Sequence, residues 1–185
     1  MKAPERVETS RLVLRKPTQS DAESIFSRYS GDPVVTQYLG WLRHQTIEHT
    51  RMFLAFSDAE WSRWPGGPYL IESRTDHRLL GGTGFGFEDP HVAATGYVLA
   101  HDSWGRGYAT EALATIVSLS PHLGIRRLFA LCHPDHAASA RVLEKCGFDL
   151  EERLNAFAEF PNWRPGHRED CLRYVRTIQS VRSGG

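Results

Sequence analysis

The stretch Ser103-Trp-Gly-Arg-Gly-Tyr-Ala-Thr-Glu-Ala-Leu113 decides how the rest of the chain is interpreted. It is preceded by Thr95-Gly-Tyr-Val-Leu-Ala100, an apolar run rich in residues that favour strands. Two glycines then alternate with other residues, and apolar residues at helical spacing follow at once. The pattern predicts a strand, a glycine turn and a helix, in that order.

The glycine turn is a candidate anion site. Glycine adopts positive φ and lets a ligand approach the backbone closely. The first N–H groups of a helix have no partner inside it, and the helix dipole favours an anion there. A phosphate or pyrophosphate is therefore expected on the backbone of Gly105, Arg106, Gly107, Tyr108, Ala109 and Thr110, with the Arg106 side chain adding a positive charge. The alternative is a plain turn that binds nothing, because the stretch matches neither a Walker loop nor a dinucleotide fingerprint.

Three segments resemble the GNAT acetyltransferases, most closely the branch that includes the ribosomal-protein N-terminal (alanine/serine) acetyltransferases. Trp104-Gly-Arg-Gly-Tyr-Ala-Thr-Glu-Ala112 is similar to the family's acetyl-CoA signature. Ser139-Ala-Arg-Val-Leu-Glu-Lys-Cys-Gly-Phe148 resembles a downstream motif of that branch. The third match is Glu8-Thr-Ser-Arg-Leu-Val-Leu-Arg15, followed by Asp21-Ala22. The three matches keep the family's order and are spread over about residues 8–176.

The patterns on either side of the glycine turn predict an α+β domain. Strands are expected at residues 10–15, 69–72, 79–87, 95–100, 125–132, 148–154 and 170–176. Helices are expected after the glycine turn and at about residues 21–30, 46–62 and 136–146. The expected fold is a mixed, mostly antiparallel sheet of about seven strands with four helices. The strands that flank the central crossover are expected to be parallel, and the resemblance implies that they splay apart with CoA in the gap.

Local signals refine these elements. Ser20-Asp-Ala-Glu23 fits a capping box, with Ser20 as N-cap of the first helix. Asp135 is the expected N-cap of the last helix and Gly147 its left-handed C-cap. Inward-facing side chains of the second helix are expected to be Met52, Phe53 and Phe56. A bulge or a close backbone approach is expected at Gly81, Gly82, Gly84 and Gly86.

The bulk composition indicates one globular domain without a polyanionic partner. In 185 residues, 22 Lys+Arg balance 22 Asp+Glu. A net charge of zero does not favour binding to nucleic acid or to an anionic membrane. We expect a single domain over residues 1–178, a disordered tail at 179–185, and a monomer or homodimer. No run suits a membrane span or a signal peptide, and the three cysteines are scattered. A cytoplasmic protein with reduced thiols is expected.

The resemblance implies that acetyl-CoA is the co-substrate and that a backbone N–H near Leu99 polarises the thioester oxygen. Lys145 is expected near a CoA phosphate, and His136 stands where the family usually has an asparagine close to CoA. The donor site so assigned comprises Val98, Leu99, Ala100, Trp104, Gly105, Arg106, Gly107, Tyr108, Ala109, Thr110, His136, Ser139 and Lys145. No metal is expected, because no further site with paired Cys or His spacing accompanies His133-Pro-Asp-His136, which is interpreted as a cluster at a helix start.

Two groups that many GNAT enzymes use for proton transfer are missing. The strand entry Ala93-Ala-Thr-Gly96 has no carboxylate base, and Leu143 stands where a tyrosine acid is usual. Ser139 matches a serine near the CoA sulfur in the resembling N-terminal acetyltransferases and is the candidate proton donor. The alternative is that its hydroxyl caps the previous helical turn. The candidate bases, acting through water, are Asp170, Glu88 and Asp89.

The expected reaction is transfer of an acetyl group from acetyl-CoA to a primary amine by direct attack in a ternary complex. Cys146 precedes a glycine at a helix C-terminus, where the dipole raises a thiol pKa, so it is interpreted as a core residue and not as a nucleophile. Two other interpretations stay open. One is an acyl-CoA-sensing module without catalysis, and the other is a transferase with a longer acyl donor.

The acceptor is expected to be small or short and partly apolar. Tyr38 and Trp41 are the candidate acceptor-binding residues, because the resemblance implies that the loop at 38–43 lines the acceptor pocket, and Trp61 and Trp64 extend the aromatic set. Weak base machinery favours an α-amine, of which about 10% is unprotonated at pH 7, over a lysine with a pKa near 10.4. A protein N-terminus, a free amino acid, a polyamine and an antibiotic all stay open.

Overall fold

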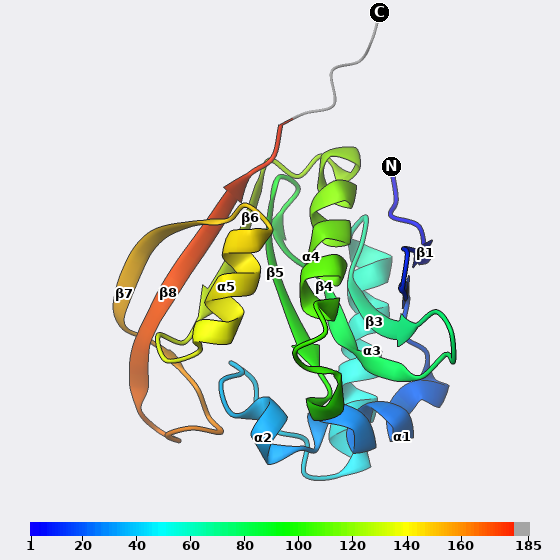
Figure 1. The fold of residues 1–185 in the computed structure, drawn as a ribbon, viewed down its shortest axis with the longest axis horizontal. Helices are drawn as coiled ribbons and strands as arrows, with labels where there is room; N and C mark the ends of the chain where they lie inside the picture. The colour runs from blue at the N-terminus through cyan, green and yellow to red at the C-terminus, as the bar shows by residue number, and fades with distance from the viewer. Residues whose placement is uncertain (180–185) are drawn as a thin grey trace, which may run out of the picture.

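The computed structural model describes residues 1–179, and the predicted tail lies outside the described residues from position 180 onward. Within the described residues, one eight-stranded sheet has the order β1-β2-β3-β4-β5-β6-β8-β7 (Figure 1). The strands are β1 (Arg6–Glu8), β2 (Leu12–Arg15), β3 (Pro68–Ser73), β4 (Leu79–Asp89), β5 (Val92–Leu99), β6 (Arg127–Cys132), β7 (Asp149–Glu159) and β8 (Arg168–Thr177). The strand beyond the seven expected is the short β1, which pairs with β2.

Helices cover both faces of the sheet. Those within residues 1–179 are α1 (Ala22–Ile25), α2 (Pro33–Thr36), α3 (Ile47–Arg63), α4 (Tyr108–Leu119) and α5 (Ala137–Lys145). In Figure 1, α4 and α5 lie in front of the strands and α3 lies behind them. A π-helical turn, η2 (Phe26–Ser30), continues α1 on the α3 side. The short α2 is the helix that the sequence pattern did not predict.

Strand alternation divides the buried side chains between the two faces. Ile71 of β3 belongs to the core that α4 covers with Leu113. The preceding residue, Leu70, belongs to a second core on the other face, with Ile25 and Leu54 from α1 and α3. The sheet is therefore a wall between two separately packed layers, and any passage between them has to cross it.

The first capping box was predicted at the wrong pair of residues. It forms between Thr18 and Asp21, where the Thr18 N–H donates to Asp21 Oδ2 at 2.7 Å, and not between Ser20 and Glu23. The physical reason is that Arg15 of β2 donates to both Asp21 oxygens, at 2.9 and 2.6 Å, which holds the carboxylate at this position.

The start of α5 also differs from the prediction by one residue. His136 is the N-cap, without a side-chain capping bond, and Asp135 lies outside the helix. The Asp135 N–H donates to His133 Nδ1 at 3.1 Å, which keeps Asp135 in the preceding turn. At the other end the prediction is confirmed, because Gly147 has φ +72° and donates to Glu144 O at 2.9 Å.

The inward face of α3 is not the predicted one. Thr50, Leu54, Ser57 and Trp61 are buried. Phe53 is half-buried, whereas Met52 and Phe56 are 69% and 55% exposed, so the prediction that these two face inward is wrong. The physical reason is that they border a cavity, described below, instead of the closed core.

β5 and β6 are parallel and separate after a short contact, as predicted. Their pairing runs from Val92↔Arg127 to Ala94↔Phe129. β5 then continues to Leu99, and β6 continues to Cys132, without further pairing between them. On its other edge β5 stays paired with β4, where a Cβ at Gly81 would overlap the Val98 carbonyl oxygen. That close approach is the one predicted for the β4 glycines.

Candidate functional site

The glycine turn between β5 and α4 has the predicted geometry. Gly105 and Gly107 have φ of +72° and +76°, and Gly107 is the N-cap of α4 without a side-chain capping bond. A Cβ built at Gly105 would meet nothing within 4 Å, and one at Gly107 would meet only the Arg11 guanidinium at 3.5 Å. The first N–H groups of α4 therefore face open space, as an anion site requires.

Arg11 supplies a second positive charge at this turn, which the sequence analysis missed. It donates from Nη1 to Arg106 O at 2.9 Å and lies 4.9 Å over the Tyr108 ring. Glu111, in the first turn of α4, accepts from Arg11 Nε at 2.7 Å and from Thr9 Oγ1 at 2.6 Å. Burial opposes ionisation of Glu111, but these hydrogen bonds keep its pKa below the usual value. The signal in the sequence was that both residues lie in the matched segments.

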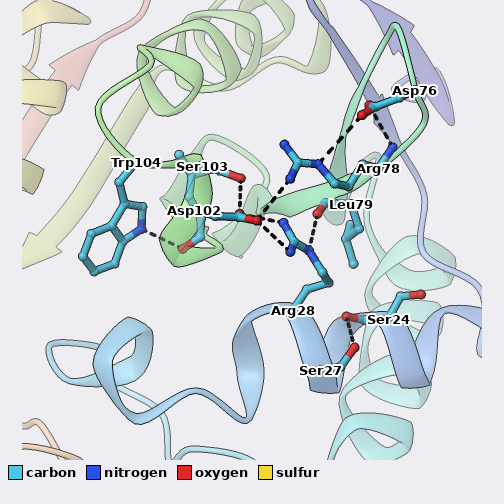
Figure 2. A network of polar contacts seen from close by, with 10 residues as sticks. Ser24, Ser27, Arg28, Asp76, Arg78, Leu79, Asp102, Ser103 and Trp104 are labelled. Atoms are coloured by element: carbon cyan, nitrogen blue, oxygen red, sulfur yellow. Dashed lines mark hydrogen bonds and ion pairs between the residues drawn. The ribbon is translucent and has the colours of Figure 1, made fainter.

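A polar network holds the loop that enters the turn (Figure 2). Asp102 accepts from both terminal nitrogens of Arg28, at 3.0 and 2.7 Å, and from Arg78 at 3.1 Å. Arg28 lies in η2 and also donates to Leu79 O of β4 at 2.9 Å. The hydrogen bonds from Arg28 lower the pKa of Asp102 to about 2. The network therefore couples η2, on one face of the sheet, to the loop that leads into the glycine turn.

The end of β5 presents a backbone N–H to the gap. Ala100 N–H donates to Leu80 O of β4 at 2.8 Å. Because successive backbone groups alternate between the two edges of a strand, the N–H and C=O of Leu99 face the β6 edge. The Leu99 carbonyl accepts from Trp104 Nε1 at 2.8 Å. The Leu99 N–H thus lies at the place that the sequence analysis assigned to it, where β5 and β6 have separated.

A cavity of about 740 Å³ passes through this gap. Its lining comes from both faces of the sheet: Ser139, Leu143 and His136 from α5 and its N-cap, and Tyr29, Phe53 and Phe56 from η2 and α3. Of the predicted donor residues, Val98, His136 and Ser139 line it. The remaining ones, from Leu99 to Thr110, continue from it along the end of β5 and the glycine turn.

Ser139 is paired with Tyr97, a contact that the sequence analysis missed. Tyr97 Oη lies 2.8 Å from Ser139 O and 2.9 Å from Ser139 Oγ. A carbonyl only accepts, so the single Tyr97 O–H proton goes to Ser139 O, and the Ser139 hydroxyl donates its own proton to Tyr97 Oη. Burial raises the pKa of Tyr97, so the phenol stays protonated. The two residues are 42 positions apart, and spacing alone carries no signal for such a contact.

Tyr29 faces the cavity from the opposite side of the sheet. The residue is 4% exposed and lines the cavity. The hydroxyl lies 3.3 Å from a Cβ built at Gly82, which is the β4 partner of Val98. Burial raises the pKa of this phenol. It is therefore a neutral polar group that faces the cavity close to the end of β5.

The predicted acceptor residues Tyr38 and Trp41 both line the cavity. The Tyr38 ring stacks on His136 at 5.1 Å, and Trp41 lies 5.3 Å from His44. Asn162, in the β7–β8 connection, donates to Trp41 O at 2.8 Å and so fixes the loop.

The other two tryptophans of the predicted aromatic set belong to the core instead. Trp61 is 4% exposed and donates to Pro68 O at 2.8 Å. Trp64 stacks on Phe87 with ring centroids 5.3 Å apart. Neither lines the cavity, so the aromatic wall is smaller than the sequence suggested.

The candidate bases do not line the cavity. Asp170 accepts from the Ala156 N–H at 3.0 Å and from Arg153 Nε at 2.9 Å, and these contacts lower its pKa. It thereby holds an irregularity in β7. Asp89 accepts from the N–H groups that close the β4–β5 turn, at 2.7 and 3.0 Å, and Glu88 is exposed. Their positions favour structural roles for both aspartates.

The C-terminal end of α5 approaches the glycine turn. Cys146 is buried, and its thiol donates to Thr110 O in the first turn of α4 at 3.4 Å. Lys145, the preceding residue, is exposed there. Burial raises the pKa of the Cys146 thiol, which agrees with a core role. Across residues 1–179, no cluster of three or more His, Cys, Asp or Glu side chains is placed to hold a metal ion, and no helix is long and apolar enough to cross a bilayer.

Comparison with known proteins gives a family match and several full-length relatives. The acetyltransferase (GNAT) domain family matches residues 11–149. The uncharacterized N-acetyltransferase YoaA of Bacillus subtilis is 34% identical over 154 residues, which cover 82% of this chain and 86% of that protein. The uncharacterized N-acetyltransferase p20 of Bacillus licheniformis is 28% identical over 157 residues, which cover 83% and 87%.

Solved structures share the whole fold at lower identity. RimL, a ribosomal L7/L12 α-N-protein acetyltransferase in complex with coenzyme A, aligns with a TM-score of 0.83 and 22% identity over 96% of this chain and all of its own. The microcin C7 self-immunity acetyltransferase MccE, in complex with acetyl-CoA and AMP, aligns with a TM-score of 0.83 and 21% identity over 95% and 98%. At these identities the likeness shows the fold.

Proposed function

Because the chain belongs to the GNAT acetyltransferase family, we propose that it transfers an acetyl group from acetyl-CoA to an α-amine, on a peptide or protein N-terminus or on a small molecule. The observation that carries the proposal is the cavity through the gap between β5 and β6. It reaches from Ser139 and Tyr97 on one face of the sheet to Tyr29 and Trp41 on the other. Two substrates that enter from opposite faces meet there, beside the Leu99 N–H.

The residues at the glycine turn fit the donor. The N–H groups of the first turn of α4 suit a pyrophosphate, and the left-handed Gly107 N-cap carries no side chain to occupy that place. Arg11 and Arg106 add positive charge beside it. Two structures that share the fold hold CoA or acetyl-CoA, which supports the same donor here. In this proposal acetyl-CoA supplies the acetyl thioester, and the Leu99 N–H donates to its carbonyl oxygen.

The proposed reaction is direct attack of the amine nitrogen on the thioester carbonyl. A C–N bond forms and the C–S bond breaks, while the amine loses one proton and the CoA sulfur gains one. Holding both substrates in the gap provides proximity, and the Leu99 N–H stabilises the negative charge that develops on oxygen. An acyl-enzyme is disfavoured, because burial raises the pKa of the thiols of Cys132, Cys146 and Cys171.

The titratable side chains that line the cavity support an α-amine as the acceptor. Among the described residues that line it, no carboxylate is available as a base. Deprotonating an α-amine with a pKa of about 7.7–8.0 costs about 1 kcal/mol at pH 7. Deprotonating a lysine with a pKa near 10.4 costs about 4–5 kcal/mol. On the leaving side, the proposed proton donor is Ser139, whose hydroxyl leaves its contact with Tyr97 Oη to donate to the thiolate.

A matched pair of peptides tests this proposal. One peptide has a free α-amine and an internal lysine, and the other has the same sequence with its α-amine acetylated beforehand. With acetyl-CoA, we expect CoA release, measured with a thiol reagent, and an acetylated N-terminus, identified by mass spectrometry, for the first peptide only. Equal acetylation of the lysine in both would contradict the assignment of the α-amine. Binding of acetyl-CoA without turnover of any amine would indicate a sensing module instead.

A further inference from the structure

The acceptor side of the cavity carries no fixed charge. Among residues 1–179 that line the cavity, none is aspartate, glutamate, lysine or arginine. Trp41, Phe53 and Phe56 form much of the wall on the α3 side. Arg43 shares a loop with Trp41 but donates to Gly31 O at 3.2 Å and does not line the cavity. A charged acceptor would therefore find no counter-ion in this wall.

Burial favours the neutral form of two histidines and one tyrosine in the lining. His44 Nδ1 lies 2.8 Å from Thr50 Oγ1, and burial lowers the pKa of His44. Burial likewise lowers the pKa of His136, whose ring stacks on Tyr38. The hydroxyl of Tyr29 is neutral as well, since burial raises its pKa. An uncharged amine can hydrogen-bond to such groups, whereas an ammonium or a carboxylate gains no charge pairing from them.

Charge in such a wall is costly for the ligand. A buried ion without a partner loses several kcal/mol of hydration that neutral contacts do not replace. Polyamines and aminoglycosides carry several ammonium groups, and a free amino acid carries a carboxylate. An amino-acid amide carries no carboxylate and only one amine, of which about 10% is unprotonated at pH 7. The exposed aromatic rim at Trp41 and Phe56 suits an apolar side chain on such a molecule.

We infer that the acceptor is an α-amine on an uncharged apolar body, of which the α-amide of an aromatic or aliphatic amino acid is the simplest example. This inference rests on the proposed acetyl transfer and narrows its substrate class. The uncharged wall at Trp41, Phe53 and Phe56 favours an acceptor whose side chain is uncharged and apolar. The Tyr29 hydroxyl, in the same lining, is a polar group to which the acceptor amine can hydrogen-bond.

A series of acceptors that differ only in the side chain tests it. Phenylalaninamide, leucinamide, lysinamide and glutamic acid α-amide share one α-amine and one carboxamide. With acetyl-CoA, we expect kcat/KM for the first two to exceed that for the charged pair by about 50-fold or more. Equal rates, or a preference for lysinamide, glutamic acid α-amide, spermidine or kanamycin, would overturn the inference while acetyl transfer stands. Turnover of no amine would overturn the proposed function and, with it, the inference.

A second experiment tests the same inference by introducing a charged residue into the cavity wall. Phe56 is 55% exposed, so Phe56→Glu adds a carboxylate to the wall at little risk to folding. We expect the ratio of kcat/KM for phenylalaninamide to that for lysinamide to fall by about tenfold. The matched control is Ala55→Glu, the same charge on an exposed residue of α3 that does not line the cavity, and its ratio should stay unchanged. An unchanged ratio in Phe56→Glu would contradict the role of the wall.

Discussion

At the scale of single residues, Tyr97 and Ser139 form a hydroxyl pair in which Ser139 is the proposed proton donor. If Ser139 donates to the leaving thiolate, Ser139→Ala should lower kcat by about 100-fold between pH 6 and 9. Tyr97→Phe should lower it by about tenfold, because Tyr97 only positions the serine. The double variant should be no worse than Ser139→Ala, since the two act in series. Unchanged kcat in Ser139→Ala, measured as pH–rate profiles, would remove the serine from the mechanism.

Tyr29 provides a second prediction at this scale. Tyr29 lines the cavity, so Tyr29→Phe, which keeps the ring and removes only the hydroxyl, should leave the melting temperature nearly unchanged. If the hydroxyl holds the acceptor amine, KM for the acceptor should rise about five- to tenfold, with the Kd for acetyl-CoA unchanged. Steady-state kinetics and calorimetric titration measure the two effects. A loss of stability with KM unaltered would show instead that the hydroxyl serves the fold.

Residue contacts also mark the limit of what the sequence reveals. The glycine turn could be predicted, because Gly105 and Gly107 adopt positive φ, a local backbone property that neighbouring residues in the sequence indicate. The Tyr97–Ser139 contact could not, because it depends on how β5 and α5 pack across many intervening residues. Asp170 was a reasonable candidate base by composition, yet its partners, Arg153 and Ala156, are supplied by strand pairing.

At the scale of elements, the β1–β2 turn is fastened to the first turn of α4. Arg11 bridges Glu111 and Arg106 O, so its guanidinium lies beside the expected pyrophosphate. Arg11→Ala should weaken acetyl-CoA binding about fivefold, which corresponds to about 1 kcal/mol. The matched control is Arg6→Ala, whose partner Glu8 lies on the same exposed strand, and its Kd should not change. Equal Kd values for the two variants in calorimetry would exclude Arg11 from the donor site.

The order of elements was easier to predict than the faces they present. Hydrophobic periodicity located α3, but it assigned Met52 and Phe56 to the core because apolar side chains usually mark the buried face. In α3, Thr50 and Ser57 share the closed face with Leu54 and Trp61. Met52, Phe53 and Phe56 border the cavity instead. The wall of the cavity thus breaks the rule on which the prediction was based, and such a break is typical of functional sites.

At the scale of the whole molecule, a nearly buried ion triad joins β2, β3 and the first helical turn. Arg15 donates to Asp21 at 2.6 Å and to Glu72 at 2.7 Å. Burial opposes ionisation of Asp21, but the hydrogen bond from Arg15 lowers its pKa in the folded protein. Its contribution to stability is therefore complete above the unfolded pKa, about 3.9, and is lost as the pH falls through the lower folded value.

The triad gives a prediction for folding. Asp21→Asn should lower the free energy of unfolding at pH 7 by about 3 kcal/mol, because it leaves Arg15 partly unpaired in a nearly buried place. The difference from the wild type should shrink below about pH 4. Urea denaturation at pH 7 and pH 3 measures both. Asp58→Asn, which removes a more exposed carboxylate 3.6 Å from Lys16, should change little. A similar loss in both variants would contradict the special role of the triad.

The most direct test of the whole account is the affinity for acetyl-CoA when the glycine turn is altered. Gly107→Asp adds a Cβ and a negative charge at a left-handed residue, φ +76°, where the pyrophosphate is expected. Gly124→Asp makes the same change at φ +80°, in an exposed turn beyond the other end of α4. By calorimetric titration, the account predicts at least about tenfold weaker binding, or about 1.4 kcal/mol, for Gly107→Asp and wild-type affinity for Gly124→Asp. Wild-type affinity in a folded Gly107→Asp protein would contradict it.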